Sequence, residues 1–175
     1  TADGGLAVTS RGVCWAVGTT PTINSSTSYD GAGAGAYQST LTGLLPGVSY
    51  FVRAYATNGA GTAYGISYAF TTHGLPVVST INIDNITMSS ANVNSDLTSD
   101  GGSTIIERGV CWSVNPSPTI MDNSTNIGVA IGNYSIDLLG LSSSTLFYAR
   151  SYAINNVGIA YGNSITFTTL NLATL

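Results

Sequence analysis

The chain has 175 residues, of which 7% are charged, and it carries four arginines, no lysine and a net charge of −4. This balance excludes the basic footprint of a nucleic-acid-binding protein and a polybasic membrane anchor. Apolar residues make up 43% of the chain, but no apolar run reaches the roughly 18 residues of a membrane-spanning helix. We therefore expect no membrane span, and the frequent Thr, Val, Ile and Tyr favour β-strands around a buried core.

The sequence repeats itself with a constant offset of 97 residues, without a gap, from Thr1/Thr98 to Val78/Leu175. The pentapeptide RGVCW, at 11–15 and again at 108–112, is the most conspicuous part of this repeat. An internal repeat indicates a modular array. A period of about 97 residues is the size of an immunoglobulin-type sandwich.

Short strands separated by Gly, Asn and Ser are predicted along the second copy, and no amphipathic helix is found. These strands are expected at 80–84, 91–97, 104–114, 134–141, 146–155 and 160–169. The counterparts of the first two would precede Thr1. The sequence therefore predicts an all-β protein of two tandem β-sandwiches, the first lacking its opening strands.

The repeat also predicts the domain boundaries. The first domain, incomplete at its N-terminal side, is expected at 1–73 and the second at 74–170. Residues 171–175 are expected to be a linker into a further repeat or a tail that contacts another subunit. We expect the open edge of the first domain to be filled by a neighbouring subunit or by an upstream segment, because unpaired strand edges are templates for another chain.

The segment LTGLLPGVSYFVRAYATNGAGTAYG, at 41–65, resembles a fibronectin type III domain. Its Leu44-x-Pro46-Gly47-x-x-Tyr50 resembles the tyrosine corner of that family, in which a hydroxyl group ties a loop to the backbone. The second copy has Phe147 in place of Tyr50. The whole pattern is similar to tandem fibronectin-like repeats in large secreted and surface proteins of Bacteroidota-type bacteria. The resemblance implies an immunoglobulin-like sandwich and a secreted or cell-surface location.

Arginines and aromatic residues at equivalent positions of the two copies form a candidate stacking or interaction face. Its members are Arg11, Trp15, Arg53, Tyr55, Arg108, Trp112, Arg150 and Tyr152. By strand alternation, Arg53 and Tyr55 should point away from the core. We expect Trp15 on the same face, with the Arg53 guanidinium stacked on its indole, and Arg150 stacked on Trp112 in the second copy. Two alternatives are an aromatic strip that binds sugar or a neighbouring chain, and a bulge at Gly12 that turns Trp15 inward.

The remaining motifs argue against catalysis. Cys14 and Cys111 are expected to point inward as small core residues, and a bond between equivalent positions of successive domains is geometrically implausible. His73, the single histidine, lies in the predicted linker, so neither thiol has a base. The glycine-rich stretch at 30–36 precedes a strand and opens no helix, which excludes a dinucleotide loop. We expect no enzyme activity and no cofactor.

The short Asp-Gly-Gly segments at 1–5 and 99–103 are expected to form hairpin turns, with a calcium site as the alternative. Taken together, the sequence indicates a structural or adhesive module whose partners are neighbouring copies of the same protein. A carbohydrate-binding or spacer module of a secreted glycan-degrading enzyme, with surface glycans as partners, is the alternative.

Overall fold

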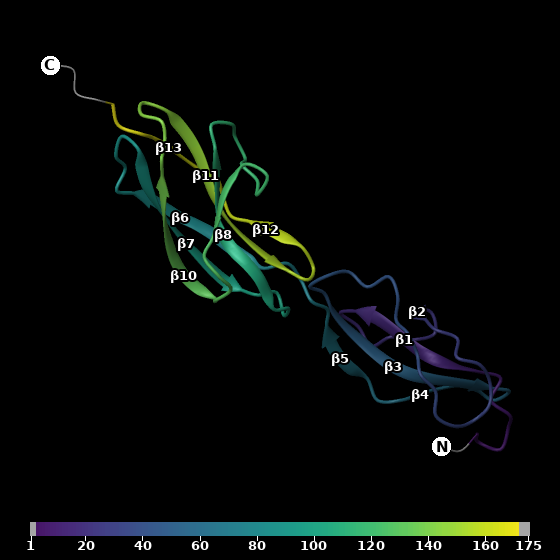
Figure 1. Cartoon of the computed structure of the whole chain (residues 1–175). Helices are drawn as coiled ribbons and strands as arrows, with labels where there is room; N and C mark the ends of the chain where they lie inside the picture. Colours follow the sequence, from purple (N-terminus) through teal and green to yellow (C-terminus); the bar gives the residue numbers. More distant parts are fainter. Residues whose placement is uncertain (1–2, 172–175) are drawn as a thin grey trace. The chain divides into compact units, whose positions relative to one another are not determined.

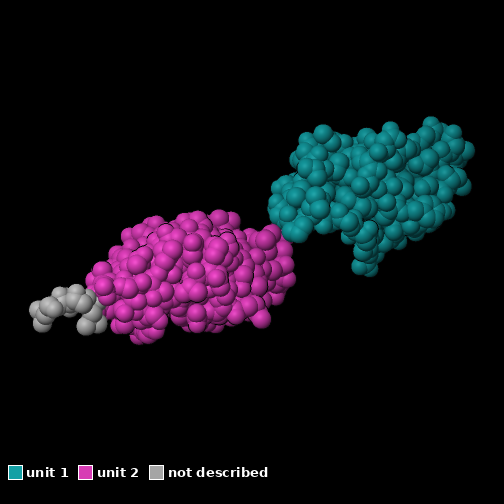
Figure 2. Space-filling view, turned by 90° about the horizontal axis from the view of Figure 1, so that it is seen from above, with its two compact units in different colours: residues 1–72 teal, residues 73–175 magenta. Residues whose placement is uncertain are grey.

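The computed structural model describes residues 3–171, and these form strands, turns and loops without a helix. The chain divides into two compact units, residues 1–72 (unit 1) and 73–175 (unit 2) (Figure 2). The boundary predicted from the repeat lies one residue later. The tail predicted at 171–175 lies outside the described residues except for Asn171.

Unit 2 is a sandwich of two antiparallel sheets (Figure 1). The smaller sheet has the order β10-β7-β6 and consists of β6 (Val77–Asp84), β7 (Ser90–Ser99) and β10 (Gly132–Leu139). The larger sheet consists of β8 (Ile105–Ser113), β9 (Asn123–Asn126), β11 (Leu146–Asn155), β12 (Ile159–Tyr161) and β13 (Ile165–Thr168). Its order is β9-β8-β11-β12, and β13 also pairs with β11. The all-β prediction is confirmed, while β9 is an addition to it.

The core of unit 2 lies between the two sheets because each sheet is apolar on the face that meets the other. Along β7 every second residue is buried, and Ala91, Val93 and Leu97 belong to the core. Val110 and Ala149 of the larger sheet join the same cluster. A period of two is the pattern of a strand with one buried face. In both units, the face of the larger sheet that carries these positions is here called the inner face.

Unit 1 contains the larger sheet alone (Figure 1). Its strands are β1 (Ser10–Val17), β2 (Ser26–Thr27), β3 (Ser49–Asn58), β4 (Gly61–Tyr64) and β5 (Tyr68–Thr71). The order β2-β1-β3-β4, with β5 also on β3, repeats that of β9-β8-β11-β12 and β13. Within residues 3–72 no second sheet covers its inner face.

The segment of unit 1 that corresponds to β10 forms no strand, because it has no strand to pair with. Residues 35–42 occupy the equivalent place in the repeat, but they form no strand. In unit 2, β10 pairs with β7 alone, and the residues equivalent to β7 would precede residue 3. A lone strand cannot satisfy its backbone N–H and C=O groups by pairing. The segment therefore remains irregular.

The inner face of unit 1 is accordingly open to solvent around Ala54, although Trp15 and Tyr50 on the same face are buried. Ala54 is exposed, whereas Ser151, its counterpart in unit 2, is 0% exposed. Val13 is partly exposed, whereas its counterpart Val110 is 0% exposed. Residues at equivalent positions are therefore buried in unit 2 and accessible to solvent in unit 1.

Candidate functional site

The register between β1 and β3 decides which residues of RGVCW share a face. It runs from Ser10↔Thr57 to Val17↔Tyr50 without a shift. Cys14 stands opposite Arg53, and Trp15 stands opposite Val52. Residues directly opposite in an antiparallel pair lie on the same face of the sheet.

The predicted stacking of Arg53 on Trp15 is therefore wrong, and so is that of Arg150 on Trp112. Arg150 stands opposite Cys111, and Trp112 stands opposite Ala149, a core residue. Trp15 lies on the inner face without the help of a bulge, since the register passes Gly12 unbroken. The side chains alternate within each strand as predicted, but the register between β1 and β3 places Cys14, and not Trp15, on the face of Arg53.

On the outer face, Arg53 and Arg150 stack on tyrosines of the neighbouring strand. The Arg53 guanidinium carbon lies 3.8 Å from the ring centre of Tyr64, and that of Arg150 lies 4.0 Å from the ring centre of Tyr161. Each arginine also donates through Nε to a proline carbonyl, Pro21 in unit 1 and Pro118 in unit 2. Contacts of this kind between a guanidinium and an aromatic ring contribute about 0.5–2 kcal/mol.

These outer-face contacts hold a loop against the sheet. The Tyr64 hydroxyl accepts a hydrogen bond from the Ile23 backbone N–H at 3.1 Å, and that of Tyr161 accepts one from Ile120 at 3.2 Å. Together with the bond to Pro21, the arginine and its tyrosine fix the loop between β1 and β2. The loop between β8 and β9 is fixed in the same way.

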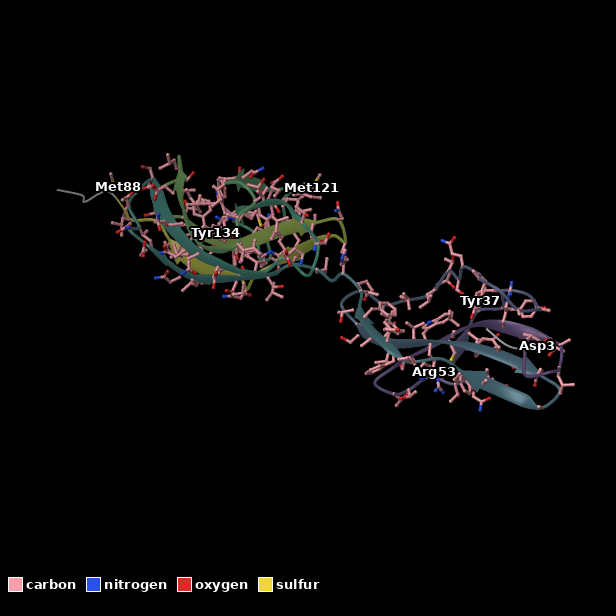
Figure 3. All side chains as sticks on the ribbon, turned by 90° about the horizontal axis from the view of Figure 1, so that it is seen from below. Asp3, Tyr37, Arg53, Met88, Met121 and Tyr134 are labelled. Atoms are coloured by element: carbon pink, nitrogen blue, oxygen red, sulfur yellow. The ribbon has the colours of Figure 1, made fainter. Side chains whose placement is uncertain are left out.

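On the inner face, Arg11 and Arg108 stack on a second pair of tyrosines. Arg11 lies 5.0 Å from the ring centre of Tyr37, and Arg108 lies 4.6 Å from that of Tyr134. The two tyrosine hydroxyls donate to the carbonyls of Gly12 and Gly109, at 2.7 and 3.0 Å. Figure 3 shows Tyr37 and Arg53 on opposite sides of the unit 1 sheet.

The inner-face arginines differ in burial and in their hydrogen bonds. Arg11 donates to the carbonyls of Asp30 and Gly33, at 3.2 and 3.0 Å. Arg108 is 8% exposed and donates to Gly132, while its buried Nε has no partner among the described residues. Burial beside this arginine raises the pKa of Tyr134, and the positive charge of Arg108 partly offsets the effect.

Tyr55 and Tyr152 lie on the outer face, as predicted, but both are buried. The Tyr55 hydroxyl donates to Ser28 O at 2.7 Å. The single proton of the Tyr152 hydroxyl has two acceptors within reach, the Glu107 carboxylate and Thr125 O at 2.9 Å. Burial, followed by the contact with Glu107, raises the pKa of Tyr152 far above its usual value.

The glycine of RGVCW leaves room for a backbone segment that passes close to it in each unit. A Cβ at Gly12 would lie 2.3 Å from the Ser28 carbonyl oxygen, and one at Gly109 would lie 1.7 Å from that of Thr125. Only glycine lets the backbone approach so closely. In RGVCW the arginine, valine and tryptophan thus lie on the inner face and the cysteine lies on the outer face. The glycine leaves room for the neighbouring backbone segment.

Cys14 and Cys111 are free and 0% exposed, as predicted for small buried residues. Their predicted inward direction is wrong, since both lie on the outer face opposite arginines. The loops that carry Pro21 and Pro118 cover them, and the Cys111 Sγ lies 3.3 Å from the Pro118 carbonyl oxygen. Burial raises the pKa of the Cys111 thiol, and the nearby Arg150 charge opposes this rise.

The predicted face is therefore a set of internal contacts on both sides of one sheet. Each arginine has its own tyrosine, and the tryptophans lie on the inner face. The sequence prediction did not include the tyrosine partners Tyr37, Tyr64, Tyr134 and Tyr161. They recur at the same offset of 97 as the arginines, and this shared periodicity was the available signal.

Two loop predictions can also be compared with the structure. The tyrosine corner is present, because the Tyr50 hydroxyl accepts a hydrogen bond from Leu45 N at 2.9 Å. Tyr50 also stacks on Phe70, with ring centres 5.7 Å apart, and in unit 2 Phe147 keeps only this stacking, on Phe167 at 5.6 Å. The turns at Asp3 and Asp100 use their carboxylates to accept backbone N–H groups. Across residues 3–171, no group of three or more acidic, histidine or cysteine side chains is placed to hold a metal ion.

Similar folds occur among solved structures. The FN1-FN3 domains of chicken CNTN1 align with 93% of this chain over 56% of their own length, at 14% identity and a TM-score of 0.45. A myokine structure aligns with 57% of this chain over 100% of its length, at 18% identity and a TM-score of 0.40. The sensor domain of the anti-sigma factor RsgI4 of Pseudobacteroides cellulosolvens aligns with 55% of this chain over 96% of its length, at 19% identity and a TM-score of 0.42.

No protein-family model matches the sequence, and no curated protein matches it. The similarity to these solved structures concerns the fold alone. In the part of the chain that the structure describes, no helix has the length and apolar character needed to cross a membrane.

Proposed function

We propose that the chain is a structural and adhesive repeat module from an array of fibronectin-like domains, in a large secreted or surface protein of a Bacteroidota-type bacterium. In this role it spaces the parts of the array and associates with neighbouring copies. The observation that supports the proposal is the internal use of the residues best suited to binding or chemistry. All four arginines stack on tyrosines, and both thiols are buried.

The composition supports the same role. Only 7% of the residues are charged, and the four basic ones each contact backbone carbonyls of their own unit. A buried arginine is costly to remove because its charge and donors are matched to fixed acceptors. An arrangement that is the same in two successive units serves the fold of each repeat.

A carbohydrate-binding role has one observation in its favour. Tyr29 and Tyr68 are 68% and 67% exposed, and exposed aromatic rings offer an apolar face with a polar tip to a ligand. Both belong to unit 1. Trp15, which is 7% exposed, and Trp112, which packs against the core of unit 2, add nothing to such a surface.

The assembly state of the purified chain tests the proposal. We expect concentration-dependent association in light scattering, and fibres or ordered contacts in electron micrographs, with no binding on an array of glycans. A strictly monomeric chain at high concentration would argue against the adhesive role. Glycan binding that the double variant Tyr29→Ala/Tyr68→Ala abolishes, while unfolding of the chain stays unchanged, would favour the alternative.

A further inference from the structure

The open inner face of unit 1 has the form of a site for a strand. Three adjoining hollows share Ala54 as a lining residue, and the first of them has a volume of about 260 Å³. Val13, Ala56 and Ile66 line these hollows, and Ile66 is 77% exposed. The lining side chains are mostly apolar, and the counterparts of Val13 and Ala56 in unit 2, Val110 and Ala153, belong to its core.

In unit 2 the strand β6 crosses the equivalent surface at Gly162. A Cβ at this glycine would lie 2.9 Å from the backbone nitrogen of Thr80 and 3.0 Å from its Oγ1. The Thr80 hydroxyl accepts a hydrogen bond from Ser151 N at 2.9 Å. The glycine thus provides the room that β6 needs to reach β11.

Unit 1 has a glycine at the same place, Gly65, but nothing lies over it. A Cβ there would meet only Ala54, with the shortest distance 3.6 Å, which is ordinary contact. The hydrogen bond from Gly65 N to Ala54 O, 2.9 Å long, has its equivalent between Gly162 and Ser151. The backbone of unit 1 is therefore shaped for a crossing strand that the described residues do not supply.

The turn at Asp3 indicates how such a strand would arrive. In unit 2 the equivalent turn at Asp100 joins β7 to β8, and its carboxylate accepts Gly102 N at 2.8 Å. In unit 1 the Asp3 carboxylate accepts Gly5 N at 2.9 Å. The carbonyls of Asp3 and Asp100 each accept a hydrogen bond from an asparagine side chain, at 2.9 and 2.8 Å. Unit 1 has thus formed the turn that receives a β7-like strand.

We propose that the inner face of unit 1 is the docking surface for a β-hairpin of the β6–β7 type, joined covalently to the turn at Asp3. Its first strand crosses β3 at Gly65, with a small hydroxyl residue in the place of Thr80. Its second strand pairs with residues 35–42, which then form the counterpart of β10. The inference goes beyond the proposed function, since it holds whatever the array binds.

The chemistry of the occupant follows from the surface. Small apolar side chains at alternate positions, as in Ala91, Val93 and Leu97 of β7, fit a face lined by Val13 and Ala54. Apolar burial of this kind gains about 25 cal/mol for each Å² removed from water. Backbone hydrogen bonds between the second strand of the hairpin and residues 35–42 fix the position of that strand, as main-chain hydrogen bonds do in strand addition.

The test joins a second copy of residues 75–97 directly in front of Thr1 in the full chain. Hydrogen exchange followed by mass spectrometry measures protection of residues 35–42. We expect their exchange to slow by about tenfold or more, because the segment gains a strand partner. Unchanged exchange, equal to that of a chain with a shuffled hairpin, would overturn the proposal.

A substitution in unit 1 makes the test specific. Gly65→Val meets only Ala54 in the present chain and should leave its exchange unchanged, but in the extended chain it should abolish the gained protection. The matched control, Gly59→Val, also adds bulk to an exposed glycine whose nearest neighbour is a leucine methyl at 3.7 Å. It should preserve the gain. Protection that survives Gly65→Val would contradict the crossing that we propose.

Two other occupants are distinguished by the same readout. If a second copy of the chain closes the face, residues 35–42 of the chain without the extra hairpin will become protected as its concentration rises. If a glycan closes it, protection will appear on addition of the oligosaccharide. Either result would overturn the covalent hairpin as the occupant.

Discussion

The two units contain the same larger sheet, but only unit 2 carries a second sheet over it. On the outer face the contacts are the same in both: Arg53 and Arg150 each stack on a tyrosine and bind a proline carbonyl. On the inner face they differ, since Ala54 is exposed and Ser151 is buried. The comparison teaches that the outer-face contacts depend on residues within one sheet and its loops. The core depends on strands that come from elsewhere in the chain.

The largest expected difference concerns Leu138, which β10 of the smaller sheet contributes to the core of unit 2. Leu138→Ala should destabilise unit 2 by about 2–5 kcal/mol, because it opens a cavity at a residue that is 0% exposed. Leu41→Ala, at the half-buried equivalent in unit 1, should cost under about 1 kcal/mol. Each unit holds one tryptophan, so fluorescence of Trp15 or Trp112 alone, with the other replaced by Phe, follows the two unfolding transitions. Equal costs would show that residue 41 is also part of a core.

The glycine of RGVCW should be equally important for the stability of both units. The backbone carbonyl oxygens next to it, of Ser28 and Thr125, lie on the outer side, where the two units are alike. Gly12→Ala and Gly109→Ala each place a Cβ under 2.5 Å from a backbone carbonyl oxygen. Both should destabilise their units by about 1–3 kcal/mol or more, since the crossing segment must shift. Chemical denaturation monitored by the same two fluorescence signals measures the effect. A harmless substitution in unit 1 alone would mean that its outer face does not resemble that of unit 2.

The arginine–tyrosine contacts should also be alike in the two units. A double-mutant cycle of Arg150→Lys with Tyr161→Leu should show a coupling of about 0.5–2 kcal/mol. The cycle of Arg53→Lys with Tyr64→Leu should give a similar value. A cycle between Arg150 and Trp112 serves as the control and should give no coupling, since these side chains lie on opposite faces. Additive effects in the first two cycles would refute the contacts as stabilising pairs.

High pH should destabilise unit 2 more than unit 1, in which burial and then Asp30 raise the pKa of Tyr37. Burial and Glu107 raise the pKa of Tyr152, and burial raises that of Tyr134, so the folded state of unit 2 favours the neutral phenols. Their stabilisation is fully present below the unfolded tyrosine pKa of about 10 and is lost as the pH rises above it. We expect the denaturation midpoint of unit 2 to fall between about pH 10 and 12. Tyr152→Phe should reduce this dependence, and an unchanged slope in that variant would remove Tyr152 as its source.

The smallest expected effect belongs to unit 1 at low pH. Hydrogen bonds from Ser28 and then Ser39 lower the pKa of Asp30, whose counterpart in unit 2 is Ile127. The stabilisation is present above the unfolded aspartate pKa of about 3.9 and is lost as the pH falls through the lower folded value. Acid titration of unfolding should therefore show a small loss in unit 1 that Asp30→Asn removes. A loss that persists in this variant would point to another carboxylate.

The sequence by itself determined the all-β class, the repeat and most strands, because strand alternation and the offset of 97 are local and periodic signals. It also determined the tyrosine corner, since the loop and Tyr50 are close in the chain. It indicated that Arg53 points outward and that both thiols are buried. These features follow from a few neighbouring residues.

Only the tertiary structure decided what each of these residues touches. Trp15 and Arg53 alternate correctly within their own strands, but the register between β1 and β3 places them on opposite faces. A shift of one residue reverses every side chain, and no single strand carries the information that sets it. Likewise, Cys14 is buried on the outer face because a loop closes over it. The fate of Val13 and Ala54 depends on strands far away in the chain, and for that reason equivalent residues are surface in unit 1 and core in unit 2.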